Sequence, residues 1–336
     1  MAKKVLVTGA GGFIGGFIVN EALRRGYEVW AAVRATTSRK YLSDSRIRFV
    51  ELDFSRPQLL EDKLREEISA HGAWDYVVHN LGATKCIDPA DFDRINYGYI
   101  RLLADTLRRL NAVPDGFLMM SSMSAIGLGD ERNYTPFTDD MPTNPNTKYG
   151  QSKLKAETYL HSLEDFPYIA LRPTGVYGPH ERDYFLMVKS IAAGFDFSVG
   201  FRRQELSFIY VSDLVAAIFD ALESGVRRRT YVLSDGKSYT QREFREIVKK
   251  ELGKRFVIPI VAPLWLLKGV CYLSEWLASL QKKASTLNRD KYIIMKQRNW
   301  NCDISRARAD FNYTPHYDLR AGLHETIHWY RDNHWL

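Results

Sequence analysis

A tyrosine and a lysine stand four positions apart in the segment YGQSK, as Tyr149 and Lys153. Positions four apart lie on one face of a helix, so the two side chains would be neighbours. A lysine ammonium beside a phenol favours the ionised phenolate and would lower a tyrosine pKa that is about 10 when unperturbed. Such a pair can pass a proton to or from a substrate oxygen. The spacing occurs by chance in many chains, so its meaning depends on the elements around it.

A glycine-rich turn lies near the start of the chain. In KKVLVTGAGGFIGG a β-branched run leads into Gly9, Gly12 and Gly15 and then into a helical pattern over residues 13–25. The missing side chains let backbone N–H groups approach a pyrophosphate, whose negative charge the helix N-terminus favours. Because the glycines stand between a strand and a helix, they predict a dinucleotide site.

Four further apolar runs alternate with helical patterns and predict strands over residues 28–33, 47–53, 74–80 and 116–122. This alternation predicts an α/β fold, a doubly wound parallel sheet of Rossmann type. Ligands of such sheets bind at the carboxyl ends of the strands. We expect the residues at five strand ends to converge on one crevice, namely Gly9, Arg34, Asp53, Gly82 and Ser122.

Beyond the tyrosine a helix is predicted to about residue 163, followed by strands within 168–179, 206–211 and 229–235. The remaining pattern is helical and irregular. We expect residues 1–171 to form the dinucleotide-binding domain, with 206–235 returning to it. Residues 172–205 and 236–336 should form a smaller, mostly helical substrate-binding lobe.

The composition limits the classes of function. The chain has 336 residues, 45% of them hydrophobic, and a modest net charge of +7, which is typical of a soluble globular protein. Its three cysteines lie far apart and its eight histidines show no ligand pattern, so we expect a reduced compartment and no metal. The first apolar run is too short for a signal peptide, which favours the cytoplasm. Basic pairs are scattered without interleaved aromatics, so we expect no nucleic-acid partner.

Together these motifs resemble the extended short-chain dehydrogenase/reductase family, the NAD-dependent epimerase/dehydratase group. They stand in the family's order as TGAGGFIG (8–15), HNLGA (79–83), SSMSAIG (121–127), YGQSK (149–153), RPTGVYGP (172–179) and FIYVSDL (208–214). The resemblance implies a nicotinamide cofactor and a catalytic set of Ser122, Tyr149 and Lys153, with Ser121 as the alternate serine.

The same resemblance implies how the cofactor is held. Asp53 would contact adenine, Asn96 would support the lysine through a water-linked network, and Pro173 and Val176 would flank the nicotinamide. The full set expected at the dinucleotide is Gly9, Gly12, Phe13, Ile14, Gly15, Arg34, Ser38, Asp53, Leu81, Gly82, Asn96, Tyr149, Lys153, Pro173 and Val176.

The second predicted strand ends in a basic residue. Rossmann proteins that prefer NAD place an acid there to accept a bond from the ribose 2′-hydroxyl. Here Val33 and Arg34 are followed by ATTSRK, so Arg34 would face a 2′-phosphate, with Ser38, Arg39 or Lys40 nearby. We expect a preference for NADP(H), with NAD as the alternative.

Several positions differ from those of the family's nucleotide-sugar enzymes. Those enzymes typically carry an asparagine where this chain has Gly175, and Arg-Asp where it has Leu206-Ser207. The Thr-Asp-Glu of the 4,6-dehydratases is replaced by Ser122-Met123-Ser124. A diphosphate needs charge-assisted donors, which are missing at these positions, although Arg202 or Arg203 could substitute.

The apolar segment 263–280 resembles instead the branch of 3β-hydroxysteroid dehydrogenases, dihydroflavonol reductases and 2-alkyl-3-oxoalkanoate reductases. We expect specificity to come from loop 172–185 and from region 263–281. The candidates for substrate contact are Ser124, Thr174, Gly175, Tyr184 and Phe185, with Trp265, Leu266, Tyr272 and Trp276 in the second region. The segment could also pack on its own lobe or touch a membrane interface, but prolines and charges interrupt any spanning run.

The favoured interpretation is an NAD(P)-dependent oxidoreductase that interconverts a secondary alcohol and a ketone on a hydrophobic 3-oxo or 3-hydroxy substrate. The alternatives are a nucleotide-sugar epimerase or reductase and a non-catalytic nicotinamide-sensing protein. The last is disfavoured because Tyr149 and Lys153 are both present. A homodimer would suit the family, but the sequence carries no signature of one.

Overall fold

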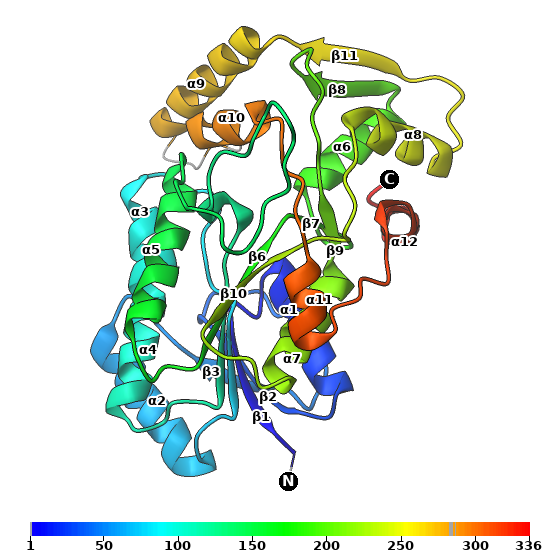
Figure 1. Ribbon diagram of the computed structural model, residues 1–336. Helices are drawn as coiled ribbons and strands as arrows, with labels where there is room; N and C mark the ends of the chain where they lie inside the picture. The colour runs from blue at the N-terminus through cyan, green and yellow to red at the C-terminus, as the bar shows by residue number, and fades with distance from the viewer. Residues whose placement is uncertain (1, 282–284, 286) are drawn as a thin grey trace.

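The computed structural model describes residues 2–281, 285 and 287–336 (Figure 1). Its centre is a seven-stranded sheet in the order β10-β6-β5-β4-β1-β2-β3, with every neighbouring pair parallel. The predicted Rossmann-type fold is confirmed. The strands are β1 (Lys4–Thr8), β2 (Glu28–Val33), β3 (Arg48–Glu51), β4 (Tyr76–His79), β5 (Gly116–Met120), β6 (Tyr168–Pro173) and β10 (Arg229–Leu233).

Helices cover both faces of this sheet, which is why its strands are apolar on both sides. Along β1, Val5 and Val7 pack with the helices of one face, while Leu6 packs with those of the other. The first face carries α1 (Phe13–Arg24), α7 (Val211–Glu223) and α11 (Ser305–Phe311); the second carries α2 (Pro57–His71), α4 (Tyr99–Arg109) and α5 (Lys148–Ser162).

The helical region between β4 and β5 is interrupted. A short α3 (Ala90–Phe92) passes through a π-helical turn, Asp93–Gly98, before α4 begins. Such turns often occur at functional sites because they redirect a side chain. Here the turn contains Asn96, which is buried against α5.

A second lobe lies beyond the carboxyl ends of the strands (Figure 1). β7 (Gly175–Tyr177) pairs with β9 (Phe208–Tyr210), and β8 (Phe195–Val199) pairs with β11 (Ile258–Ala262). Its helices are α6 (Asp183–Ala192), α8 (Gln241–Glu251), α9 (Leu264–Leu280), α10 (Arg289–Lys296) and α12 (Leu319–Asp332). No helix in the described ranges is long and apolar enough to cross a membrane.

The strand predicted within residues 206–211 lies outside the main sheet. Within segment 206–235, β10 joins β6 and α7 packs beside α1, but β9 pairs with β7 in a separate sheet. The reason is local, because only Thr174 separates β6 from β7 and the chain turns out of the main sheet there.

Candidate active site

The turn between β1 and α1 packs tightly against the end of β4. Gly9 has φ +69°, and a Cβ there would stand 2.9 Å from the backbone of Asn80 and of Leu81. A Cβ on Gly15 would overlap the carbonyl of Gly9. No side chain caps the N-terminus of α1 at Gly12, so backbone N–H donors of its first turn, near Phe13 and Ile14, are available to an anion. These observations fit a pyrophosphate cradle.

The residues expected around the adenosine lie beside this turn. Arg34 directly follows β2 and is exposed, with its backbone held in a turn by Thr37 at 2.9 Å and 3.0 Å. Asp53 is half-buried; hydrogen bonds from Ser55 lower its carboxyl pKa, and nearby arginine charge, including that of Arg34, adds to this shift. Ser38 lies in the loop that passes over the glycine-rich turn. Arginine and serine donors therefore gather at one edge of the cradle.

The serine and tyrosine of the predicted catalytic set meet at the end of β5. Ser122 caps a short 3₁₀ helix, Met123–Ala125, and its Oγ accepts the backbone N–H of Ser124 at 3.2 Å. Tyr149 lies half-buried in the first turn of α5, which Thr147 caps. Burial raises the pKa of Tyr149, and a hydrogen bond with the Ser122 side chain partly offsets the rise.

The expected effect of Lys153 on the tyrosine pKa differs from what the structure shows. The ammonium is buried and donates to the carbonyl oxygen of Met120 at 2.7 Å. Burial lowers the pKa of Lys153 to about 8, with Glu157 acting in the opposite direction. The tyrosine pKa is therefore raised rather than lowered, because burial dominates and the lysine charge is directed to a backbone carbonyl.

Asn96 and Gly82 flank the lysine. A Cβ on Gly82 would stand 3.0 Å from both the Lys153 Nζ and the Asn96 Oδ1, so these two side chains would have to move by a few tenths of an ångström to admit one. The Asn96 amide bonds to the backbone of Ala83 at 2.8 Å and 3.0 Å and to the Ser152 Oγ at 2.9 Å. It thereby fixes the loop after β4 against α5 and shapes the space around the ammonium.

The adjacent serines have different partners because successive strand residues point to opposite faces. The Ser121 hydroxyl donates to the buried carboxylate of Glu157. That carboxylate also accepts from the Arg172 guanidinium at 2.6 Å and 3.0 Å. Ser121 is thus engaged in a buried network, whereas Ser122 faces the tyrosine.

The sequence did not single out His79, at the end of β4. Its Nδ1 lies 3.1 Å from the Thr8 Oγ1, and burial together with the charge of Lys153 lowers its pKa to about 3, so the ring is neutral. Its Nε2 and the Thr174 Oγ1 are buried without a hydrogen-bond partner among the residues described. Thr174 is one of the predicted substrate contacts, and the position of His79 at a strand end is the signal that could have identified it. Unsatisfied groups at this edge fit a site that is completed by a ligand.

Among the candidates for substrate contact, Tyr184 and Gly175 belong together. The Tyr184 hydroxyl fills the space that a side chain at position 175 would need. Phe185, by contrast, packs against Tyr330 and Trp335 with ring centroids 5.0 Å and 4.9 Å apart, so it stabilises the lobe rather than facing the cleft. The remaining candidates for substrate contact are Ser124, which is buried, and Thr174 at the β6–β7 junction, between Pro173 and Val176, which are expected at the nicotinamide.

The second candidate region, 263–281, also differs from expectation. Trp265, Leu266, Tyr272 and Trp276 project from the outer side of α9 and are exposed. They do so because α9 contacts the protein through a narrow stripe, in which Leu267 and Cys271 are the buried residues. These four side chains line an outer surface rather than the cleft.

Polar contacts hold α10 beside α5. The Asp290 carboxylate accepts the backbone N–H of Tyr149 at 3.1 Å. Asp183, at the start of α6, pairs with Lys85 at 3.0 Å and with Lys291 at 3.1 Å. Helix α10, the start of α6, the loop that contains Lys85 and the start of α5 therefore meet at one side of the site.

The fold, the glycine cradle and the Ser122–Tyr149–Lys153 arrangement define the class, a nicotinamide-dependent enzyme of the extended short-chain dehydrogenase/reductase type. Comparison with known proteins identifies the family. The model of the NAD dependent epimerase/dehydratase family matches residues 5–234, and the chain belongs to that family.

Its relatives act on different substrates. A Methanocaldococcus jannaschii protein provisionally named UDP-glucose 4-epimerase is 28% identical over 342 residues, covering 98% of this chain and 99% of the relative. The decarboxylating sterol-4-alpha-carboxylate 3-dehydrogenase of Dictyostelium discoideum is 24% identical over 335 residues, covering 96% and 99%. The structure of dTDP-glucose 4,6-dehydratase from Bacillus anthracis with NAD superposes with a TM-score of 0.78 at 19% identity, covering 99% and 98%.

Proposed function

We propose that this protein is an NADP-dependent oxidoreductase that interconverts a ketone and a secondary alcohol on a hydrophobic 3-oxo or 3-hydroxy substrate. The bound nicotinamide would supply or accept the hydride. In the reductive direction, the Tyr149 hydroxyl donates its proton to the carbonyl oxygen, which the Ser122 hydroxyl also holds. The Lys153 ammonium, which lies beside Gly82 at the predicted ribose side, would help to hold the cofactor.

The observation that carries the substrate proposal is the contact between Tyr184 and Gly175. A phenol from α6 occupies the space of the asparagine that sugar-nucleotide enzymes typically present there. A second observation supports it, because Arg203 pairs with Glu205 and its charge is already compensated. At positions 175 and 206 a diphosphate would lose its hydration without gaining strong donors, which leaves the exposed Arg202 to hold it, whereas an apolar ligand gains from burial.

The preference for NADP rests on the edge of the cradle. Arg34 is exposed directly after β2, and Ser38 lies in the loop that follows. An arginine there attracts a 2′-phosphate, whereas an acid would repel it. Solved relatives bind NAD, so NAD is the alternative cofactor.

We further propose that residues 172–205 and 236–336, apart from α11 on the main sheet, form the substrate-binding lobe, while 1–171 and 206–235 bind the dinucleotide. The contacts of Asp183 and Asp290 with residues of both parts support a substrate space beside Tyr149. The sugar-epimerase alternative has one specific support, the resemblance to the archaeal relative over nearly the full chain.

Turnover assays separate these functions. The purified chain is given NADPH with a 3-oxosteroid or with a β-keto acid that carries a long alkyl chain, and separately NAD with UDP-glucose. The proposal requires oxidation of NADPH by at least one of the ketones. Interconversion of the UDP-sugar with no ketone turnover would replace it by the epimerase function.

A further inference from the structure

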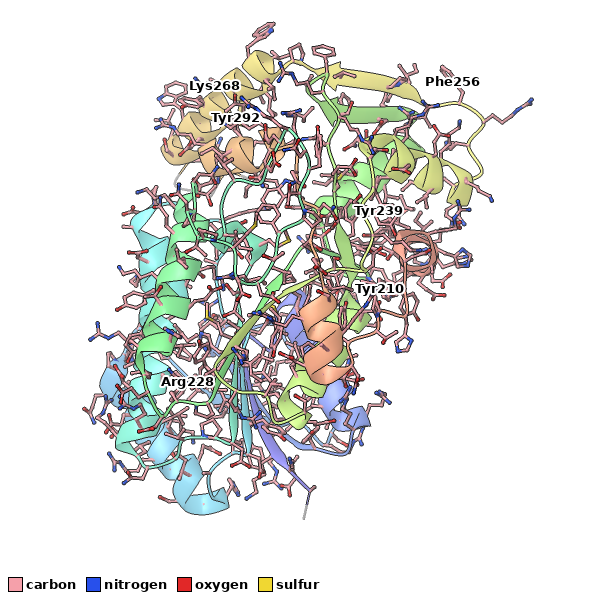
Figure 2. The ribbon with its side chains drawn as sticks, viewed as in Figure 1. Tyr210, Arg228, Tyr239, Phe256, Lys268 and Tyr292 are labelled. Atoms are coloured by element: carbon pink, nitrogen blue, oxygen red, sulfur yellow. The ribbon has the colours of Figure 1, made fainter. Side chains whose placement is uncertain are left out.

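The outer end of the second lobe exposes an unusually apolar surface. Most of the large hydrophobic side chains that are exposed in the described chain lie within residues 195–201 and 256–280, which we call the outer apolar surface. It consists of β8, β11 and α9, at the top of Figure 1. Phe256 and Lys268 mark its two sides in Figure 2. Contiguous patches of this kind on soluble proteins mark interaction sites.

The small sheet of this surface is apolar over one whole face. In the parallel register, Ile258 stands opposite Phe195 and Ile260 opposite Phe197, followed by Val199 and Ala262. Alternate residues of a strand share a face, so these side chains form one apolar layer. Phe197 is 58% exposed. The layer therefore faces solvent.

The helix α9 adds a broad apolar arc. At about 100° per residue, most of its exposed apolar side chains cover nearly half of the circumference, with Leu273 and Leu280 near the centre of the arc and Trp265 and Trp276 on the side nearer Lys268. Lys268 and Glu275 lie together on one flank. An apolar arc with tryptophans and a charged flank is typical of helices that lie in a membrane interface.

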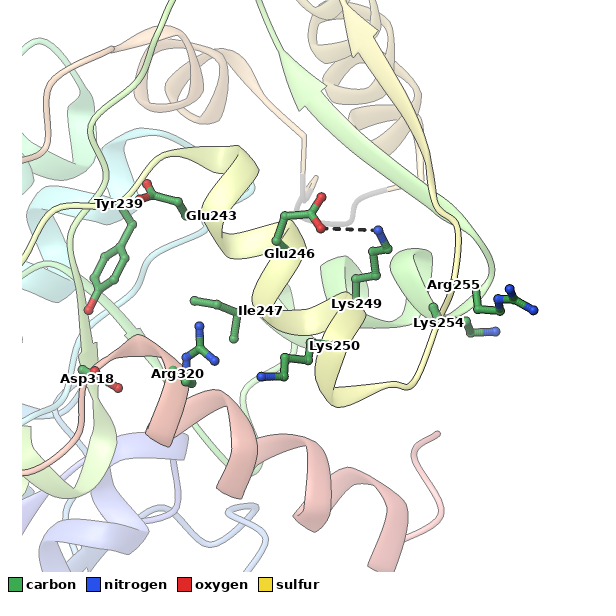
Figure 3. Close-up of a pocket in the computed structure, with 10 residues that line it drawn as sticks. All are labelled: Tyr239, Glu243, Glu246, Ile247, Lys249, Lys250, Lys254, Arg255, Asp318 and Arg320. Carbon is green, nitrogen blue, oxygen red and sulfur yellow. Dashed lines mark hydrogen bonds and ion pairs between the residues drawn. The ribbon is translucent and has the colours of Figure 1, made fainter.

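A basic groove adjoins this surface (Figure 3). It encloses about 720 Å³ between α8 and the start of α12. Five basic residues line it, Lys249, Lys250, Lys254, Arg255 and Arg320, together with three acidic residues, Glu243, Glu246 and Asp318. Glu246 pairs with Lys249 at 3.4 Å, and the lining as a whole keeps an excess of two positive charges. Lys254 and Arg255 immediately precede Phe256, so the positive charge begins where the apolar surface ends. Anionic lipid headgroups attract such clusters.

Acidic groups on the apolar surface itself are compensated. Asp196 is buried and pairs with Arg245 at 3.3 Å, and Glu275 pairs with Arg289 at 3.4 Å. The surface therefore presents apolar and positive groups together. A symmetric dimer through this face would place two basic grooves near each other, which like-charge repulsion disfavours.

We propose that the outer apolar surface docks on an anionic lipid bilayer, with α9 and the β8–β11 sheet in the headgroup region and the basic groove on lipid phosphates. Docking would also bring the site near the bilayer, with α9 and α10 between them, because α9 packs on α10 and Asp290 of α10 bonds to the Tyr149 backbone. The proposal rests on the exposed apolar side chains of the outer apolar surface and on the positive charge of the groove, and it does not depend on the identity of the substrate.

Sedimentation of the full chain with lipid vesicles tests this proposal. We use phosphatidylcholine vesicles and vesicles in which about a third of the lipid is phosphatidylserine. The variants are Leu273→Ser with Trp276→Ser, and Lys254→Glu with Arg255→Glu, all at exposed positions. The matched controls are Leu59→Ser and Arg65→Glu on α2, which is remote from this end and similarly exposed.

The proposal predicts binding that is stronger to the anionic vesicles. Each double variant should weaken the partition coefficient on the order of tenfold or more, because it removes apolar burial or headgroup attraction, and the controls should leave it unchanged. Absence of vesicle binding by the wild type, or equal binding by the double variants, would overturn it. A second outcome would also overturn it. If the wild type does not bind vesicles but forms concentration-dependent dimers in sedimentation velocity, and the Leu273→Ser, Trp276→Ser variant does not form them, the surface binds a second copy of the chain instead.

Discussion

The hydroxyl of Tyr184 occupies the space that a side chain on Gly175 would need. These two residues are nine positions apart in sequence, and the volume of the tyrosine side chain on α6 compensates for the missing side chain on β7. This pairing explains why the chain has glycine where sugar-nucleotide enzymes typically have asparagine. It also gives the first prediction.

Gly175→Ala should lower the free energy of unfolding by about 1–3 kcal/mol, because the new methyl group overlaps the phenolic oxygen. Adding Tyr184→Phe to this variant should recover part of the lost stability. It removes the phenolic oxygen, and the ring carbon that carried the oxygen is 3.1 Å from the position of the new methyl group. Denaturant unfolding of the two single variants and the double variant measures the coupling. Additive losses would show that the two residues are not matched.

The cofactor proposal predicts a specific loss in Arg34→Ala. Removal of the guanidinium should weaken NADP binding by roughly tenfold or more and change NAD binding little, because only NADP carries the 2′-phosphate. Dissociation constants for both cofactors, with Arg46→Ala as an exposed control, provide the measurement. If the wild type binds NAD more tightly than NADP, the proposal is wrong.

The buried pair of Glu157 and Arg172 predicts an asymmetric effect on stability. Both side chains are 6% exposed and their closest atoms are 2.6 Å apart. Glu157→Ala should cost about 3–5 kcal/mol because it leaves a buried guanidinium without its partner. Replacing both by methionine should cost less than the single change. A larger loss in the double variant would contradict this account.

The pH dependence of stability should reflect Asp139. Burial raises its pKa from 3.8 to about 6, so between these values the folded chain binds more protons than the unfolded chain. Through this group, the free energy of unfolding falls as pH rises from about 4 to 6. Asp139→Asn removes the titrating group, so the variant does not lose this stability. The difference in free energy of unfolding, variant minus wild type, should therefore increase by about 2–3 kcal/mol between about pH 4 and 7. A difference that is independent of pH would contradict the assigned shift.

Catalysis should depend on Tyr149 in a way that cofactor binding does not. Tyr149→Phe should reduce turnover by about 10²–10⁴-fold or more and leave the dissociation constant of NADP nearly unchanged, because only the proton donor is lost. Lys153→Ala should damage both, since its ammonium lies beside Gly82 at the predicted ribose side. Tyr159→Phe, on the same helix, is the control. Retention of most activity by the first variant would refute the assignment.

Local patterns in the sequence were sufficient for much of the fold. The strand and helix alternation predicted the parallel sheet, and the spacing of Tyr149 and Lys153 placed them on one face of α5. These features depend on periodicity and on short spacings. They can therefore be predicted without knowledge of long-range contacts.

Other features depended on contacts that no local pattern contains. The pairing of β9 with β7 follows from the turn at Thr174, and the partner of Ser121 is Glu157, thirty-six positions away. Apolar composition in 263–281 could not show whether Trp265 faces the cleft or solvent. The answer depends on the narrow contact that α9 makes with the rest of the lobe.

The most direct test of the central claim is the near-ultraviolet absorbance of reduced nicotinamide when the protein is mixed with NADPH and a 3-oxosteroid or a long-chain β-keto acid. The account predicts net consumption of NADPH, with an equal amount of alcohol formed, for the wild type and not for Tyr149→Phe. Unchanged absorbance with every ketone, together with conversion of UDP-glucose to its epimer, would contradict it.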